Sequence, residues 1–227
     1  GGQIINTPEV ENYPGTGIVS GFQLASDMYE QATKLGAEMA FGEVVSLEKN
    51  ADGNFKIVTD GGEEFEAKSV ILATGVKSRP LGIDREEELT GMGVSYCATC
   101  DGAFFRGKDV AIMGGGNTAL EDAEYMSTIA NKVYLVHRRD KFRGDRVTVD
   151  RLSKKDNVEF ILNSVPKALK GSPKLDALVI ENTENGELRE LEVQGVFVAY
   201  GQIAQNAAFD KLTELDKAGF FASSEDC

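Results

Sequence analysis

Residues 108–130 read KDVAIMGGGNTALEDAEYMSTIA, and residues 132–139 continue as KVYLVHRR. An apolar run ends in three glycines, a segment with helical periodicity follows, and a second apolar run comes after it. This order predicts a strand over residues 108–116, a helix over 117–130 and a strand over 132–139. Because a helix connects them, the two strands should be parallel. The stretch therefore predicts an α/β fold.

The glycines at the first turn fit the spacing G-x-G-x-x-G/A, with Gly114, Gly116 and Ala119 at its fixed positions. The first glycine permits a tight turn, the second lets the backbone approach a pyrophosphate, and the small third residue lets the helix pack closely. Free N–H groups at the helix N-terminus then bind the phosphates. The pattern predicts a Rossmann-like dinucleotide site, with a purely structural turn as the alternative. The candidate contacts are Gly114, Gly115, Gly116, Asn117, Thr118 and Ala119.

The second strand of this unit indicates which dinucleotide is bound. NAD-binding chains usually end this strand in Asp or Glu, which binds the ribose hydroxyls. This chain has His137, Arg138 and Arg139 there, and Arg143 four residues further on. Guanidinium groups bind a 2′-phosphate through charge-assisted hydrogen bonds, so the cluster predicts NADPH. The alternative is a solvated basic turn, and we expect His137 to pack near the adenosine.

Further apolar runs extend the α/β pattern. Residues 21–39 predict a helix with Leu24, Met28, Ala32 and Leu35 on one face and Gly36 as its stop. Gly61 and Gly62 predict a hairpin between two of the strands. Strands are expected over residues 54–60, 64–75, 157–162, 175–183, 188–193 and 195–201.

Composition narrows the class of protein. The chain has 227 residues, 41% of them hydrophobic and 27% charged, with a net charge of −13. An excess of negative charge argues against a nucleic-acid partner bound through phosphates. No apolar run reaches the length of a membrane span, and no signal peptide is visible. The three cysteines are too few for a secreted disulfide framework, so the sequence favours a cytoplasmic protein.

Two of the three cysteines, Cys97 and Cys100, form a C-x-x-C pair followed by Asp101. A structural zinc site needs four ligands, and only Cys227 and His137 remain to supply them, so no metal is expected. A disulfide closing so short a loop restrains the unfolded chain little. A reversible redox pair is the preferred interpretation. Asp101 is either its proton donor and acceptor or a turn residue.

Three motifs, CATCDG (97–102), GGGNTA (114–119) and HRRDKFR (137–143), occur in an order and spacing that resemble the bacterial-type, low-molecular-weight thioredoxin reductases. These are class II pyridine nucleotide-disulfide oxidoreductases. GGQ at the start, VENYPG (10–15) and ILATG (71–75) resemble their flavin-domain segments. The resemblance implies electron transfer from NADPH through FAD to the dithiol and on to thioredoxin, usually in a homodimer.

The resemblance also implies roles for single residues. Cys100 would exchange electrons with the flavin, Cys97 would attack the thioredoxin disulfide, and Asp101 would be the acid–base. The 114–119 turn would hold the NADPH pyrophosphate, and Arg138, Arg139 and Arg143 the 2′-phosphate. The implied FAD contacts are Gly1, Gly2, Gln3, Asn12, Thr74 and Gly75.

In domain terms, the resemblance implies an NADPH domain with the dithiol, residues 81–202, inserted in an FAD domain formed by residues 1–80 and 203–227. The chain departs from the family pattern because an N-terminal flavin GxGxxG unit and a C-terminal flavin segment are absent from it. We therefore expect a fragment that lacks the main FAD pyrophosphate site. The alternatives are the flavoprotein of an alkyl hydroperoxide reductase system, which would favour NADH and lack the arginines, and a non-catalytic NADPH-binding fragment.

Overall fold

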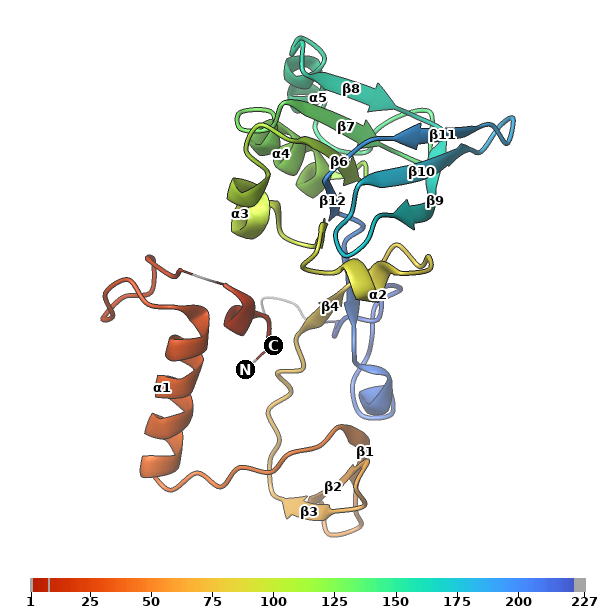
Figure 1. Ribbon diagram of the computed structural model, residues 1–227. Coiled ribbons are helices and arrows are strands. Elements are labelled where there is room, and N and C mark those ends of the chain that lie inside the picture. The colour runs from red at the N-terminus through yellow and green to blue at the C-terminus, as the bar shows by residue number, and fades with distance from the viewer. Residues whose placement is uncertain (1, 8, 223–227) are drawn as a thin grey trace. The chain divides into compact units, whose positions relative to one another are not determined.

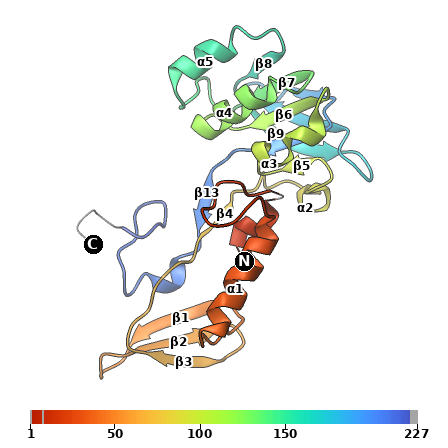
Figure 2. The ribbon, with the colours of Figure 1, turned by 90° about the vertical axis from the view of Figure 1, so that its left-hand side faces the viewer.

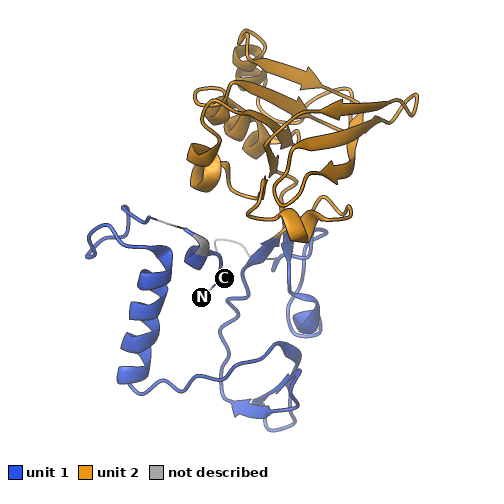
Figure 3. Cartoon of the chain, viewed as in Figure 1, with its two compact units in different colours: residues 1–77, 203–227 blue, residues 78–202 orange. Residues whose placement is uncertain are grey.

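The computed structural model describes residues 2–7 and 9–222, which form two compact units (Figure 3). The central unit comprises residues 78–202. The discontinuous unit comprises residues 1–77 together with 203–227. The chain passes from one unit to the other within β4 (Val76–Ser78) and β13 (Gln202–Ala204), which pair as a two-stranded sheet.

A five-stranded parallel sheet forms the middle layer of the central unit, in the order β5-β12-β6-β7-β8 (Figure 1). The predicted strand–helix–strand unit is present as β6, α4 and β7, and the two strands are parallel. The α/β fold class predicted from the sequence is therefore confirmed. The bounds are Val94–Ser95 (β5), Asp109–Met113 (β6), Lys132–Val136 (β7), Val158–Ile161 (β8), Gly195–Val198 (β12) and Asn117–Met126 (α4).

Both faces of this sheet are covered, which explains why its strands read as continuous apolar runs. Side chains alternate along β6 because successive residues of a strand point to opposite faces. Val110 and Ile112 pack with the helix layer of α4 and α5 (Arg146–Leu152). Ala111 and Met113 pack with an antiparallel sheet formed by β9 (Ser164–Lys170), β10 (Ala177–Asn182) and β11 (Leu188–Leu191).

Three short elements complete the central unit near its N-terminal end. They are α2 (Glu86–Leu89), α3 (Ala98–Asp101) and the 3-10 helix η2 (Gly102–Phe105). Gly102 is buried against α4, and a Cβ at this position would lie 2.7 Å from the Met126 Sδ atom and 2.8 Å from the Tyr125 ring. This close approach fixes α3, which carries the cysteine pair, against α4.

The discontinuous unit contains one long helix and a small antiparallel sheet (Figure 2). Helix α1 (Gly21–Lys34) is capped by the Ser20 side chain, and the chain leaves it through Gly36 at φ +94°. Of the expected apolar face Leu24 is buried, whereas Leu35 is 83% exposed. The other elements are η1 (Gly2–Asn6), β1 (Val44–Lys49), β2 (Phe55–Thr59), β3 (Glu64–Ala67) and η3 (Ala207–Phe209).

Several sequence predictions differ from the structure. The strand expected over residues 64–75 ends at Ala67, because no strand in the described part of the chain pairs with residues 68–75, and Ile71 is 93% exposed. The helix expected over 117–130 ends at Met126. The predicted hairpin at Gly61 and Gly62 is confirmed as the antiparallel pair β2–β3. In the described residues, no helix combines the length and the apolar character of a membrane span.

Candidate functional site

A cavity of about 840 Å³ opens in the central unit at the carboxyl ends of β6 and β12. The chain continues outward from β6 to β7 and β8 on one side, while β12 lies on the other side of β6. Such a switch point is where open α/β sheets bind ligands. The lining is Arg79, Leu81, Gly82, Ile83, Gly114, Gly115, Gly116, Thr118, His137, Arg138, Arg143, Val165, Pro166, Ala199, Tyr200 and Gly201.

The glycine turn forms one wall of this cavity, and its glycines have different surroundings. A Cβ on Gly114 would lie 2.6 Å from the Ala199 carbonyl oxygen and 2.8 Å from the Ala119 Cβ, so only glycine allows this close packing. Apart from its neighbours along the chain, no atom of the described residues would lie within 4 Å of a Cβ on Gly116. Gly116 is also the N-cap of α4, and no side chain caps the helix there. The exposed backbone and the free first-turn N–H groups suit a phosphate.

The predicted basic cluster lies beside this turn. Arg138, Arg139 and Arg143 are exposed, and none of them has a carboxylate within 4.0 Å among the described residues. Arg138 and Arg143 line the cavity, whereas Arg139 does not. Unpaired guanidinium groups in so acidic a chain leave a local positive field suited to a bound anion.

His137 occupies the position at which NAD-binding chains carry an acidic residue. Its side chain is 7% exposed and stacks on Phe142, with 5.6 Å between ring centroids. It also packs on Gly115, where a Cβ would lie 2.3 Å from the Nδ1 atom. Burial, followed by the charges of Arg143, Arg139 and Arg138, lowers the pKa of His137. The Nε2 atom is buried and has no hydrogen-bond partner among the residues that the structure describes, which marks a polar group available to a ligand of the cavity.

The cysteine pair is oxidised: Cys97 and Cys100 form a disulfide. Cys97 is the N-cap of α3, and its sulfur accepts a hydrogen bond of 3.2 Å from the Cys100 backbone N–H. This N–H would stabilise a thiolate on Cys97 once the disulfide is reduced. Both cysteines are half-buried, with the exposed Thr99 between them, so the sulfurs can be approached from outside.

Asp101 is tied to the cysteine pair through Ser95, a residue that the sequence did not single out. The Ser95 hydroxyl donates to Asp101 Oδ2 at 2.7 Å and accepts from the Cys97 backbone N–H at 3.1 Å. Asp101 also lines a second cavity of about 600 Å³, together with Met92 and the largely exposed Phe104. The described residues contain no cluster of metal-ligating side chains around the cysteines or elsewhere.

Glu86 is a further buried charged group that the sequence did not reveal. It is 8% exposed, and its carboxylate accepts hydrogen bonds from the backbone N–H groups of Leu81 at 2.7 Å and Gly82 at 2.9 Å. The Tyr96 hydroxyl donates to it at 2.5 Å, and burial together with this contact raises the pKa of Tyr96. Leu81 and Gly82 line the larger cavity, and Tyr96 precedes Cys97.

The residues proposed for flavin lie in the discontinuous unit, and those that the structure describes are exposed. The Gln3 side-chain amide donates to the Val76 carbonyl at 2.6 Å, and Val76 directly follows Thr74 and Gly75 in the sequence. The Thr74 hydroxyl donates to the Asn206 side chain at 2.6 Å. Gly2 precedes Gln3 in η1, Asn12 makes no described side-chain contact with this group, and Gly1 lies outside the described residues.

A parallel sheet with a dinucleotide-type turn and a neighbouring C-x-x-C disulfide defines a pyridine nucleotide-disulfide oxidoreductase. The family described as "Pyridine nucleotide-disulphide oxidoreductase" matches residues 1–227. The chain is 40% identical to a thioredoxin reductase of Listeria innocua, over all of this chain and 70% of that protein. It is 37% identical to the thioredoxin reductase of Bacillus subtilis, over 99% of this chain and 71% of that one.

Solved structures agree with these relatives. The thioredoxin reductase of Streptococcus pyogenes is 40% identical, with a TM-score of 0.77 over 99% of this chain and 73% of that chain. The thioredoxin reductase of Giardia duodenalis is 36% identical, with a TM-score of 0.76 over 96% of this chain and 71% of that chain. The chain belongs to the thioredoxin reductase family of pyridine nucleotide-disulfide oxidoreductases, as the sequence motifs predicted. Membership implies a flavin and a pyridine nucleotide as cofactors.

Proposed function

We propose that this chain is an NADPH-dependent thioredoxin-disulfide reductase that uses FAD. The net reaction would convert NADPH, a proton and a thioredoxin disulfide into NADP⁺ and a thioredoxin dithiol. The observation that carries the proposal is that one compact unit contains both a C-x-x-C disulfide beside a carboxylate and a cavity with an open glycine turn and unpaired arginines.

The nucleotide cavity suits NADPH. The Gly116 backbone and the uncapped N-terminus of α4 would face the pyrophosphate, and Arg138 and Arg143 the 2′-phosphate. The unpartnered His137 Nε2 atom would gain a hydrogen bond from the ligand. Arg139, outside the cavity lining, would add positive charge at its edge. The residues proposed to bind FAD, which supplies two-electron transfer between nucleotide and dithiol, are Gly1, Gly2, Gln3, Asn12, Thr74 and Gly75.

At the dithiol, the Cys97 thiolate would attack one sulfur of the thioredoxin disulfide, which forms a mixed disulfide and releases the other thioredoxin sulfur as a thiolate. Cys100 would then attack Cys97 Sγ, which restores the Cys97–Cys100 disulfide and releases the second thioredoxin sulfur. Two electrons pass to thioredoxin in this exchange. Asp101, held by Ser95, would move the proton that the departing thiolates need.

Thioredoxin would approach the exposed side of the cysteine pair, where Met92 and Phe104 offer apolar surface beside Asp101. We place this exchange in the cytoplasm, because thioredoxin-type dithiols act where thiols are kept reduced. A homodimer is also proposed from the family resemblance.

The test uses the dithiol form of the chain, a flavin-complete form of the protein and three cysteine variants. The dithiothreitol-reduced chain, freed of reductant, should reduce one equivalent of thioredoxin in a single turnover, and both Cys97→Ser and Cys100→Ser should abolish this. Cys227→Ser is the matched control and should retain it. In a flavin-complete form of the protein, NADPH-driven flavin bleaching should survive in all three variants because it precedes the dithiol. Thioredoxin reduction by Cys97→Ser or Cys100→Ser would contradict the proposal. Loss of thioredoxin reduction in Cys227→Ser alone would contradict it too.

A further inference from the structure

We propose that Glu124 and Arg151 are positioning residues for the arginine loop, defined as residues 138–145. Through this loop they would set the preference of the chain for a 2′-phosphorylated dinucleotide over its unphosphorylated counterpart. The inference rests on the proposed NADPH-binding function. It assigns a role to a pair of residues that lie outside the nucleotide cavity and have no contact with the cysteines.

The arginine loop needs anchors because its charge opposes a compact arrangement. Residues 138–145 contain Arg138, Arg139, Lys141 and Arg143 against only two aspartates, and Arg146 follows at the start of α5. None of these cations has a carboxylate within 4.0 Å among the described residues. Like charges at this density repel one another, so the position of each guanidinium depends on how the backbone is held.

Backbone hydrogen bonds anchor the end of the loop to the glycine turn. The N–H groups of Arg143 and Gly144 both donate to the Gly115 carbonyl, at 2.7 and 3.1 Å. The next N–H, that of Asp145, donates to the Asn117 side chain at 2.8 Å. Gly144 permits this approach, because a Cβ there would lie 2.5 Å from Leu120 Cδ1. Arg143 is therefore placed by its own backbone hydrogen bond and by those of the two residues that follow it.

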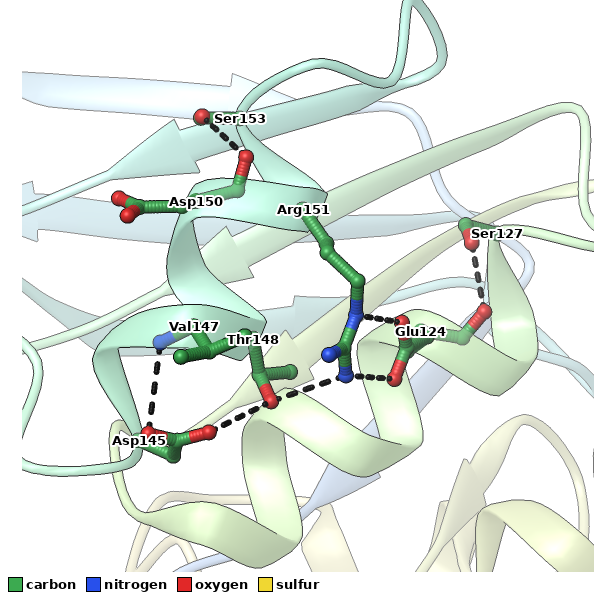
Figure 4. Close-up of polar contacts among 8 residues, drawn as sticks. All are labelled: Glu124, Ser127, Asp145, Val147, Thr148, Asp150, Arg151 and Ser153. Carbon is green, nitrogen blue, oxygen red and sulfur yellow. Dashed lines mark hydrogen bonds and ion pairs between the residues drawn. The ribbon is translucent and has the colours of Figure 1, made fainter.

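Asp145 in turn is held by a chain of polar contacts that ends on α4 (Figure 4). It caps α5 by accepting from the Val147 N–H at 3.3 Å, and it accepts from the Thr148 hydroxyl at 3.4 Å. Arg151 donates to Thr148 Oγ1 at 3.1 Å and makes a forked contact with Glu124, at 2.7 and 3.0 Å.

The Glu124–Arg151 pair therefore fixes α5 to α4, and α5 carries the capping residue that closes the arginine loop. Loss of the pair should let α5 and Asp145 shift, which releases Arg143 from the cavity edge. The pyrophosphate side should be unaffected, because Gly114 at the start of the turn is held by its own packing on Ala119 and Ala199. Only the contact with a 2′-phosphate depends on the loop, so NADP⁺ binding should respond and NAD⁺ binding should not.

The experiment measures NADP⁺ and NAD⁺ affinities of the full chain by calorimetry. Arg151→Met and Glu124→Gln should each weaken NADP⁺ binding by about two- to fivefold, the range for an exposed ion pair, with NAD⁺ affinity unchanged. The charge swap Glu124→Arg with Arg151→Glu should restore NADP⁺ affinity. Arg151→Met added to Arg143→Ala should cause no further loss, because the residue it positions is already gone.

Arg189→Met is the matched control. It breaks a pair of similar exposure with Glu159, at 2.7 Å in the same unit, and should leave the NADP⁺ to NAD⁺ ratio unchanged. If Arg151→Met weakened NADP⁺ and NAD⁺ binding equally, or left the NADP⁺ to NAD⁺ affinity ratio unchanged, the inference would be overturned and the proposed function would stand. A wild-type chain that binds NAD⁺ as tightly as NADP⁺ would contradict the proposed function and the inference with it.

Discussion

Replacing Gly116 with alanine should weaken nucleotide binding and leave the fold intact, whereas the same replacement at Gly114 should damage the fold. The two glycines are separated by a single residue in the same turn, so they form a matched pair. Only their surroundings differ. Gly114 faces buried backbone and the Ala119 side chain, while Gly116 faces the open cavity.

The magnitude at Gly114 follows from two contacts. The new Cβ would lie 2.6 Å from the Ala199 carbonyl oxygen and 2.8 Å from the Ala119 Cβ, and neither atom belongs to a flexible side chain. Overpacking of this kind costs about 1–3 kcal/mol. For a chain of this size each kcal/mol lowers Tm by about 2–4 °C. A fall in Tm is therefore the expected result for Gly114→Ala.

At Gly116 the backbone is extended, with φ −94° and ψ −175°, which alanine adopts without strain. Reduced entropy of the unfolded chain favours alanine by about 0.4–1 kcal/mol, and the poorer N-cap opposes it by a similar amount. Tm should hardly change. The methyl group would nevertheless occupy the space through which a phosphate reaches the α4 N-terminus, so NADP⁺ affinity should fall at least about tenfold, or about 1.4 kcal/mol.

Thermal unfolding by circular dichroism and NADP⁺ titration by calorimetry separate the two effects. Gly116→Ala with wild-type NADP⁺ affinity would show that the turn is structural only and that the nucleotide binds elsewhere. A drop in Tm for Gly116→Ala as large as that of Gly114→Ala would show that the open space beside Gly116 is not open in solution. Either result would refute the assignment of this turn to the pyrophosphate.

Neutral replacements of Arg138 and Arg139 should weaken NADPH binding and spare NADH, since the charge-assisted Arg138 contact is worth about 1.5–3 kcal/mol and Arg139 adds positive charge at the cavity edge. Equal losses for both nucleotides would assign the arginines to the fold. The single histidine, His137, should titrate below its usual pKa in an NMR titration, and a bound 2′-phosphate should raise that pKa. Because the folded-state pKa is the lower one, stability from this group is present above about pH 6.5 and falls as the pH drops. Burial and Glu121 raise the pKa of Asp122 to about 6, so its stability contribution is lost as the pH rises through 6. Asp122→Asn should therefore raise unfolding free energy by about 1 kcal/mol at pH 7.5, after allowance for solvent screening, and by almost nothing near pH 4; equal gains at both values would exclude the titration.

Local signals in the sequence are sufficient to predict the elements at the core of the central unit. The apolar run over β6, the glycines after it and the helical spacing of Leu120 and Ala123 act over a few residues, so they predict a strand, a turn and a helix without knowledge of the rest. The same is true of the C-x-x-C pair, whose chemistry depends on its own spacing. The family motifs combine such local signals.

Elements whose stability comes from distant contacts were missed. Strand β9 contains Pro166, which argues against a strand, yet Pro166 pairs with Ile180 where the register shifts, a position at which a strand tolerates proline. Helix α5 is short, contains Val147 and Val149, and is held by the Arg151 contact with a residue 27 positions away. The strand expected over 64–75 shows the reverse error beyond Ala67, since the apolar run over 68–75 finds no partner strand among the described residues.

Glu86 is the clearest example of a site residue whose contacts could not be predicted from the sequence. A carboxylate removed from water is costly unless hydrogen bonds replace its hydration, and the donors here are Leu81, Gly82 and Tyr96. No spacing rule links a backbone turn, an acidic residue and a tyrosine in this way. These hydrogen bonds connect the nucleotide cavity to the segment that carries the cysteine pair. Leu81 and Gly82 form part of the nucleotide cavity, and Tyr96 is the residue before Cys97. Any movement of the cavity wall away from Tyr96 would leave a buried charge short of a donor, so the wall and the cysteine-bearing segment are held in one fixed arrangement.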